Sequence, residues 1–199
     1  MARPKNKEND ILSAAMEVFL ERGFSETSIQ DIATKAGVGK GTIYDYFKSK
    51  EELFFQSLKQ DILNISEIYK EKSLQQRSFS IRLMQFIDLF QEVILDNYKR
   101  FEYYMNTGIG VLSPENLIEI KNMGEQCKEE SANFVVDILK QGIEEGMVGE
   151  SDIRFSADMI QGMIFAHTER CFTRNFSEEQ KKEEQVKLIN MIMTGVGAK

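Results

Sequence analysis

The sequence predicts an all-α protein, and three observations support this fold class. Apolar residues recur at three- and four-residue spacing in nearly every periodic segment, as on the buried face of an amphipathic helix. Capping boxes of the Ser/Thr-x-x-Glu/Gln form recur along the chain and mark helix starts. No segment alternates like a convincing strand, and 13 glycines and 2 prolines among 199 residues are too few for a turn-rich all-β protein.

The first fifty residues show the pattern of three helices. The first carries an apolar stripe and is expected to end before Gly23, which can adopt the left-handed conformation. Thr27 and Gln30 form a capping box, which predicts Thr27 as the N-cap of a short helix reaching about residue 35. Residues 36–39 are then a tight turn, and residues 40–47 predict another short helix.

Longer helices are predicted after residue 49, covering about residues 50–72, 79–105, 114–145, 152–172 and 178 onward. Capping boxes at Ser49 and Ser177 mark two of the starts, and Ser113 before Pro114 marks another. Ser151 or Asp152 is expected to begin the fourth of them. Residues 107–113 contain glycine and predict a loop. Gly146 is expected to end the helix over residues 114–145.

Residues 29–48 carry the most informative pattern, which is a helix, a turn of three to four residues and a second helix. Two short helices that cross steeply need a small residue at their contact, and Ala33 is placed for it. The turn needs a residue that tolerates positive φ, and Gly37 supplies one. The segment therefore predicts a helix-turn-helix, whose second helix can lie in a DNA major groove. The alternative is a helical hairpin that only packs.

Charge and composition narrow the classes of function. The net charge is −7, but residues 1–50 are net +1 and residues 51–199 net −8, so a DNA-facing module can lie only near the start. Cys127 and Cys171 form no CxxC motif, and His167 is the one histidine. We therefore expect no disulfide framework, no metal site, no catalytic residue and no cofactor. With no signal peptide and no apolar stretch near 20 residues, we expect a cytoplasmic protein that does not span a membrane.

The residues around this motif are similar to those of a known family. The matching segments are Gly23-Phe24, Thr27, Asp31-Ile32-Ala33, Ala36-Gly37-Val38, Lys40-Gly41-Thr42-Ile43-Tyr44, Tyr46-Phe47 and Lys50-Glu51-Glu52-Leu53. They resemble the N-terminal signature of the TetR family of bacterial transcriptional regulators, over about residues 8–55. The resemblance implies a homodimer with a three-helix DNA-binding head, a linking fourth helix and a helical body that holds the effector pocket and the dimer surface. We accordingly expect a helix-turn-helix domain over residues 1–50 and a ligand-binding and dimerisation domain over residues 51–199.

The resemblance implies a set of DNA contacts in this sequence. The recognition helix would present Lys40, Gly41, Thr42, Tyr44 and Asp45 to the duplex. The expected backbone contacts are Thr27, Ser28, Tyr46, Lys48 and Lys50. Each has a structural alternative, namely helix capping for the hydroxyls, packing for the tyrosines and solvated charge for the lysines. Gly39 departs from the family, where serine is frequent, and removes a capping hydroxyl.

The body supplies candidate ligand and dimer residues. The expected effector-lining residues are Phe86, Phe90, Tyr103, Tyr104, Met123, Phe134 and His167. A Phe/Met stripe at helical spacing is more often plain core, so that alternative stays open. Apolar stripes on the last two helices predict a two-fold interface formed by Met159, Gly162, Met163, Ala166, Ile189 and Met193.

These observations together predict a ligand-responsive transcriptional repressor. As a dimer it would bind a palindromic operator in double-stranded DNA, and a small apolar or amphipathic effector would release it. Two alternatives belong to other classes: a helical enzyme, and a helix-turn-helix scaffold that binds protein. The sequence contains no nucleophile–base pair and no Gly-rich phosphate loop, which weighs against an enzyme. DNA binding by the isolated dimer would exclude the protein-binding scaffold.

Overall fold

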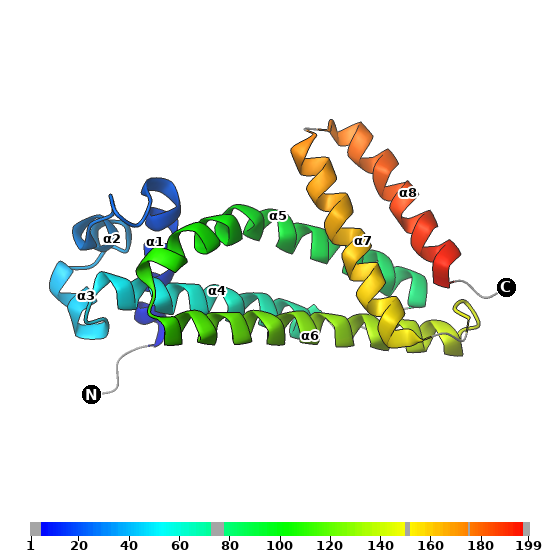
Figure 1. Cartoon of the computed structure of the whole chain (residues 1–199), viewed down its shortest axis with the longest axis horizontal. Coiled ribbons are helices and arrows are strands. Elements are labelled where there is room, and N and C mark those ends of the chain that lie inside the picture. Colours follow the sequence, from blue (N-terminus) through cyan, green and yellow to red (C-terminus); the bar gives the residue numbers. More distant parts are fainter. Residues whose placement is uncertain (1–4, 73–77, 150–151, 175, 197–199) are drawn as a thin grey trace. The chain divides into compact units, whose positions relative to one another are not determined.

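The protein is all-α, as predicted, in a computed structural model that describes residues 5–72, 78–149, 152–174 and 176–196 (Figure 1). The helices of the described residues are α1 (Lys5–Arg22), α2 (Ile29–Lys35), α3 (Lys40–Tyr46), α4 (Lys50–Lys72), α5 (Phe79–Val111), α6 (Pro114–Glu144), α7 (Ile153–Thr173) and α8 (Glu178–Val196). No strand occurs in this part of the chain. None of these helices is long and apolar enough to span a membrane.

The chain forms two compact units that share three helices. The first contains Met1–Ile65 and Lys99–Cys127, and the second contains Ser66–Tyr98 and Lys128–Lys199. The helices α4, α5 and α6 therefore each contribute residues to both units.

An aromatic cluster stabilises the first unit. The ring of Phe19 on α1 lies 5.2 Å from that of Phe54 on α4, and Phe24 after α1 packs within 5.5 Å of both. Tyr103 on α5 meets Phe54 edge-on at 6.2 Å. The short helices α2 and α3 join this core through the fully buried Ile32, Ala33 and Ile43. Packing therefore holds these short helices, which are too short to be stable alone.

In the second unit, α5, α6, α7 and α8 each bury one apolar face. The largest buried side chains on α5 are Phe79, Leu83, Phe86 and Ile87, and α6, α7 and α8 contribute Val135, Ile138, Leu139, Ala157, Ile160, Ile164, Leu188 and Ile192. Gly142 on α6 lets Phe79 and Val148 approach closely, because a Cβ built there would lie 2.7 Å from the Phe79 ring and 2.5 Å from a Val148 methyl. This glycine is required for packing.

Most of the predicted helix ends are confirmed. Among the residues that the structure describes, Gly23, Gly37 and Gly146 have positive φ, each at a predicted turn or stop. The hydroxyls of Ser49, Ser113 and Ser177 accept from the amides of Glu52, Asn116 and Gln180. The carboxylate of Asp152 likewise caps α7 by accepting from the Phe155 amide.

Two local predictions are wrong. Ser28, not Thr27, is the N-cap of α2, because its hydroxyl forms a reciprocal capping box with Asp31. The helix α5 continues to Val111 instead of ending near residue 105, so the loop predicted over residues 107–113 is largely helical. Val111 and Leu112 pack against the core of the first unit. Their burial outweighs the cost of glycine in a helix, which is about 1 kcal/mol per residue.

Candidate functional site

The helix-turn-helix is formed by α2, the turn at residues 36–39 and α3. Ala33 is fully buried where the helices meet, and its carbonyl accepts from the Val38 amide at 3.0 Å. Gly37 adopts φ +65°, where a residue with a Cβ would be strained. The roles predicted for the small residue and for the turn glycine are therefore confirmed.

The helix α3 buries one side and exposes the other. Ile43 and the following Phe47 are buried at 0% and 2% exposure. Lys40, Gly41, Tyr44 and Asp45 are exposed, and Thr42 is half-buried. The Lys40 ammonium lies 5.9 Å from the centre of the Tyr44 ring. The structure thus brings the predicted base-reading residues onto one helix of seven residues, held from behind by the core.

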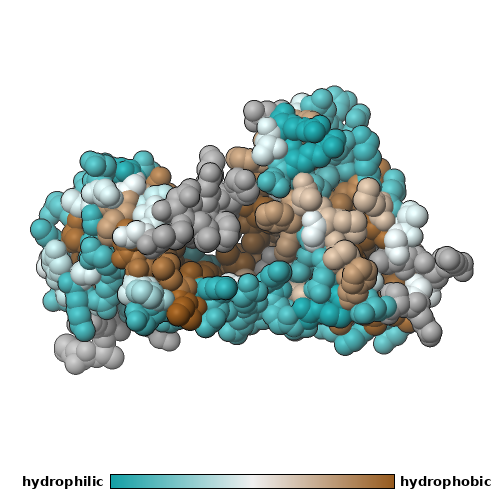
Figure 2. All heavy atoms as spheres, in the orientation of Figure 1, coloured by the Kyte–Doolittle hydropathy of each residue, from teal (hydrophilic) through white to brown (hydrophobic). Residues whose placement is uncertain are grey.

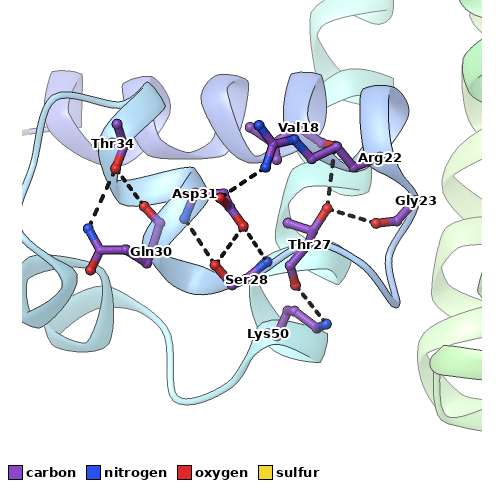
Figure 3. A network of polar contacts seen from close by, with 9 residues as sticks. All are labelled: Val18, Arg22, Gly23, Thr27, Ser28, Gln30, Asp31, Thr34 and Lys50. Carbon is purple, nitrogen blue, oxygen red and sulfur yellow. Dashed lines mark hydrogen bonds and ion pairs between the residues drawn. The ribbon is translucent and has the colours of Figure 1, made fainter.

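The start of α2 is closed by internal hydrogen bonds (Figure 3). The Ser28 hydroxyl and amide donate to one Asp31 carboxylate oxygen at 2.6 and 2.9 Å. Arg22 donates to the other oxygen at 3.0 Å. The hydrogen bonds from Ser28 lower the pKa of Asp31, with a smaller contribution from Arg22. The carboxylate of Asp31 therefore already accepts the hydrogen bonds that the Ser28 amide and hydroxyl could otherwise donate to a phosphate.

Thr27 is directed into the head instead of toward solvent. Only 2% of it is exposed, and its hydroxyl donates to the Gly23 carbonyl at 2.7 Å (Figure 3). Its side chain is therefore poorly placed to contact a phosphate, which weighs against the contact that the sequence suggested.

Lys50, another predicted phosphate contact, is engaged inside the first unit. Its ammonium donates to the carbonyls of Phe24 and Thr27 at 2.8 and 2.9 Å, and lies 4.4 Å from the centre of the Phe24 ring. These bonds tie the start of α4 to the loop between α1 and α2. Lys48 is exposed on the same segment, so it remains the better placed of the two lysines for a phosphate. Tyr46 is half-buried and packs on Phe47, with ring centres 6.2 Å apart.

In the second unit, three of the predicted ligand residues form an aromatic cluster, in which Phe90 and Phe134 are half-buried. Phe86 is 1% exposed and packs on Phe90 at 5.3 Å and on Phe134 at 5.6 Å. The Arg82 guanidinium lies 5.7 Å from the centre of the Phe134 ring. For Phe86, this arrangement matches the core alternative that the sequence left open.

A recess of about 740 Å³ lies in the second unit, on the other side of α5 from Phe86 and Phe90. Its lining comes from α5, α7, α8 and the segment before α8: Asp88, Gln91, Glu92, Leu95, His167, Thr168, Cys171, Phe172, Phe176, Lys181, Lys182 and Gln185. Of the predicted ligand residues, only His167 lines it. Tyr103 and Met123 belong to the first unit, and the side chain of Tyr104 lies outside the described part of the chain.

Hydrogen bonds connect the helices that line this recess, and two of the contacts are made by His167. Nδ1 of His167 lies 3.1 Å from the Gln91 amide nitrogen, and Nε2 lies 3.7 Å from Sγ of Cys171. Burial lowers the pKa of His167 and raises that of the Cys171 thiol, so both side chains are neutral near pH 7. Gln185 on α8 donates to Asp88 on α5 at 2.6 Å. The spacing of His167 and Cys171, one helical turn apart, was the sequence signal that could have located this site.

The recess is not arranged as a metal site. Within the described ranges, no group of three His, Cys, Asp or Glu side chains is placed to hold a metal ion.

The last two helices expose apolar side chains. On α7, Phe155 and Met159 are 60% and 48% exposed, and Gly162 and Ala166 are exposed on the same stripe. The buried Ala157, Ile160 and Ile164 occupy the opposite side of this helix. On α8, Val186 is 57% exposed, and Ile189 and Met193 are half-buried, as is Met163 on α7. Figure 2 shows apolar surface gathered along the course of α7. Phe155 and Val186 extend the predicted set.

A helix-turn-helix head with an exposed recognition helix, joined to a helical body with a recess, defines a class of DNA-binding transcriptional regulators. Residues 11–56 match the family described as bacterial regulatory proteins, tetR family. This match identifies the N-terminal part of the chain as a TetR-family DNA-binding domain, and the protein is a DNA-binding transcriptional regulator.

Individual relatives agree with this assignment. The chain is 27% identical to the fatty acid metabolism regulator protein of Bacillus subtilis over 169 residues, covering 82% of each chain. It is 27% identical to the transcriptional repressor KstR2 of Mycobacterium tuberculosis over 141 residues, covering 71% of this chain and 68% of that protein. Its fold resembles that of the transcriptional regulator FadR from Bacillus subtilis in complex with stearoyl-CoA, with a TM-score of 0.64 at 22% identity, covering 94% and 98% of the two chains. The family and these relatives are transcriptional regulators, not enzymes.

Proposed function

We propose that the protein is a repressor that binds a palindromic operator as a homodimer and is released by a small amphipathic effector. The observation that carries this proposal is the exposed face of α3, with Lys40, Thr42 and Tyr44 set over the buried Ile43. A lysine can donate to guanine acceptors, and a threonine offers a methyl group to thymine. We keep the division into a DNA-binding part over residues 1–50 and a ligand-binding and dimerisation part over residues 51–199 as part of the proposal.

The contacts to DNA divide into reading and positioning. Lys40, Gly41, Thr42, Tyr44 and Asp45 meet base edges or the adjacent backbone, and Lys48 meets a phosphate. Tyr46, Ser28 and Thr27 act mainly within the head, because each is packed or engaged in an internal hydrogen bond.

The dimer forms through α7 and α8. Phe155 and Met159 belong to an exposed apolar stripe, and a contiguous apolar stripe on a protein surface marks an interaction site. A two-fold axis pairs this stripe with its own copy and sets two α3 helices into major grooves about 34–36 Å apart.

The effector enters the recess between α5, α7 and α8. Leu95, Phe172 and Phe176 offer apolar contacts, while Gln91, His167 and Gln185 offer hydrogen bonds. One relative named for fatty acid metabolism, and a fold neighbour that holds stearoyl-CoA, favour a long-chain acyl group. The same α5 contributes Tyr103 to the core of the first unit. Effector binding would shift α5, and this shift would transmit the signal to the DNA-binding head.

The test begins with an operator selected from random duplexes by the full-length protein. Fluorescence anisotropy then follows operator release during titration with stearoyl-CoA, with free coenzyme A and a sugar phosphate as comparison compounds. We expect release by the acyl compound alone. Release by all three, or only by the phosphorylated sugar, contradicts the effector class. Failure to select any duplex favours the protein-binding scaffold.

A matched pair of variants tests the site of the effector. Leu95→Trp fills the recess, and Leu63→Trp places the same bulk at a similarly exposed leucine of α4 that does not line it. We expect Leu95→Trp to bind the operator normally and to resist release, and Leu63→Trp to respond like the wild type. Equal responses of the two variants contradict the assignment.

A further inference from the structure

A thiol and an imidazole lie side by side in the recess of the second unit. His167 and Cys171 are one turn apart on α7, so their side chains project from the same face of the helix. Nε2 of His167 lies 3.7 Å from Sγ of Cys171, and both residues line the recess. Nδ1 of His167 lies 3.1 Å from the side-chain amide of Gln91 on α5. No nucleophile–base pair was expected from the sequence, and the folded chain forms one at the wall of a cavity.

This arrangement suits transfer of the thiol proton to the imidazole. Burial lowers the pKa of His167, so its ring is unprotonated near pH 7 and can accept a proton. When Nε2 takes that proton, both ring nitrogens carry hydrogen, and Gln91 can accept from Nδ1 through its oxygen once the amide turns over. Gln91 thus stabilises the imidazolium that proton transfer creates.

Burial also makes this thiol selective. It raises the pKa of Cys171, so the thiol stays protonated and does not react as a free thiolate with every electrophile in solution. Only 7% of Cys171 is exposed, and it lines the recess. An electrophile must therefore first occupy the recess, where Leu95, Phe172 and Phe176 offer contacts for an apolar group. The amide of Gln185 can donate to a carbonyl oxygen of the same molecule.

We propose that Cys171 captures amphipathic α,β-unsaturated carbonyl compounds covalently in the effector recess, with His167 as the base. The Cys171 sulfur bonds to the β-carbon, and the electron pair of the carbon–carbon double bond moves toward the carbonyl as an enolate. The thiol proton passes to Nε2 of His167 and then to the α-carbon, which leaves a saturated carbonyl compound bound as a thioether and regenerates the imidazole. No oxidant or further reactant takes part. This inference rests on the proposed effector site and adds a chemical class of effector to it.

The second cysteine provides a control within the same chain. Cys127 belongs to the first unit and does not line the recess. It is half-buried, so it is more exposed than Cys171. Solvent exposure alone would therefore favour reaction at Cys127, whereas the contacts inside the recess favour Cys171.

The test follows adduct formation on the full-length protein by intact-mass and peptide mass spectrometry. The probe is the enone benzylideneacetone, and the comparison compound is benzylacetone, which has the same skeleton without the double bond. Cys171→Ser removes the nucleophile, Cys127→Ser is its matched control, and His167→Gln removes the base but keeps a hydrogen-bonding side chain. Circular dichroism confirms that the variants fold. Fluorescence anisotropy follows release of the selected operator by the enone and by stearoyl-CoA.

We expect one benzylideneacetone per wild-type chain, attached to Cys171 on the order of tenfold faster than to Cys127, and no adduct from benzylacetone. His167→Gln should slow the reaction by about 100-fold or more, as expected for loss of a general base, and Cys127→Ser should react like the wild type. The enone should release the operator from the wild type and not from Cys171→Ser, which should still respond to stearoyl-CoA.

Equal reaction at the two cysteines, or a wild-type rate in His167→Gln, overturns the inference. An adduct at Cys171 that leaves the operator bound overturns its role as an effector. If stearoyl-CoA fails to release the wild type while the enone forms its adduct and releases the operator, the proposed acyl effector is wrong and the covalent site stands.

Discussion

Replacing Lys50 separates a structural role from a DNA contact. Lys50→Met keeps most of the side-chain stem and removes the ammonium that donates to the carbonyls of Phe24 and Thr27. A hydrogen bond from a charged group contributes about 1.5–3 kcal/mol, and the contact with the Phe24 ring about 0.5–1 kcal/mol. Because Lys50 is only half-buried, water replaces part of these interactions. We therefore expect the free energy of unfolding to fall by about 2 kcal/mol.

Two measurements on this variant check the reasoning. For a chain of this size, 2 kcal/mol lowers the melting temperature by about 4–8 °C, which thermal denaturation followed by circular dichroism detects. The salt slope of DNA binding should stay at the wild-type value, because an ammonium held inside the head neutralises no phosphate. An unchanged melting temperature together with a slope lowered by about one per protomer would refute this account and restore the phosphate contact.

Lys48→Met is the matched control. Lys48 lies two residues away and is exposed, and its backbone amide, not its side chain, donates to Glu52. The unfolding free energy should therefore change by less than about 0.5 kcal/mol. The salt slope should fall by about one per protomer, the reverse of the pattern expected for Lys50→Met.

Three further changes test packing, base reading and assembly. Gly142→Ala places a methyl group 2.5 Å from a methyl of Val148, so chemical denaturation should show a loss of about 1–3 kcal/mol. Gly124→Ala on the same helix has open space and should gain up to about 1 kcal/mol, and equal effects of the two would contradict the packing argument. Thr42→Ala should change preference at one position of each half-site by about 1–3 kcal/mol in a binding-site selection; a uniform loss of affinity would argue against base reading. Met159→Asp should yield monomers or aggregates by light scattering, and a stable wild-type monomer at micromolar concentration would exclude the proposed dimer.

The local features of the head could be predicted because their causes are local. Ala33 and Gly37 meet steric requirements of a turn between two short helices, and these requirements follow from neighbouring residues alone. Capping works in the same way, since Ser49, Ser113 and Ser177 bond to amides three residues ahead. Where two caps compete at adjacent positions, the local pattern is insufficient, and Ser28 replaced Thr27 because the Thr27 hydroxyl is buried against Gly23.

Partners that are distant in the sequence could not be predicted. Lys50 bonds to carbonyls 23 and 26 residues before it, and a sequence pattern cannot distinguish this lysine from one facing a phosphate. The recess is a similar case, because Gln91 and Leu95 on α5 meet His167 only after α7 has packed. The aromatic stripe of the same helix predicted a ligand surface, and in the structure Phe86 is buried while Phe90, which packs on it, is half-buried.

By itself, the sequence determined the all-α class, the helix-turn-helix and the exposed face of α3. Each depends on helical periodicity or on contacts within a few residues. Only the tertiary structure decided which charged side chains form hydrogen bonds and ion pairs inside the head, where α5 ends and which face of α5 lines the recess. These outcomes depend on burial against segments far along the chain, because the free energy of burial is set by what covers a side chain and not by its neighbours in sequence.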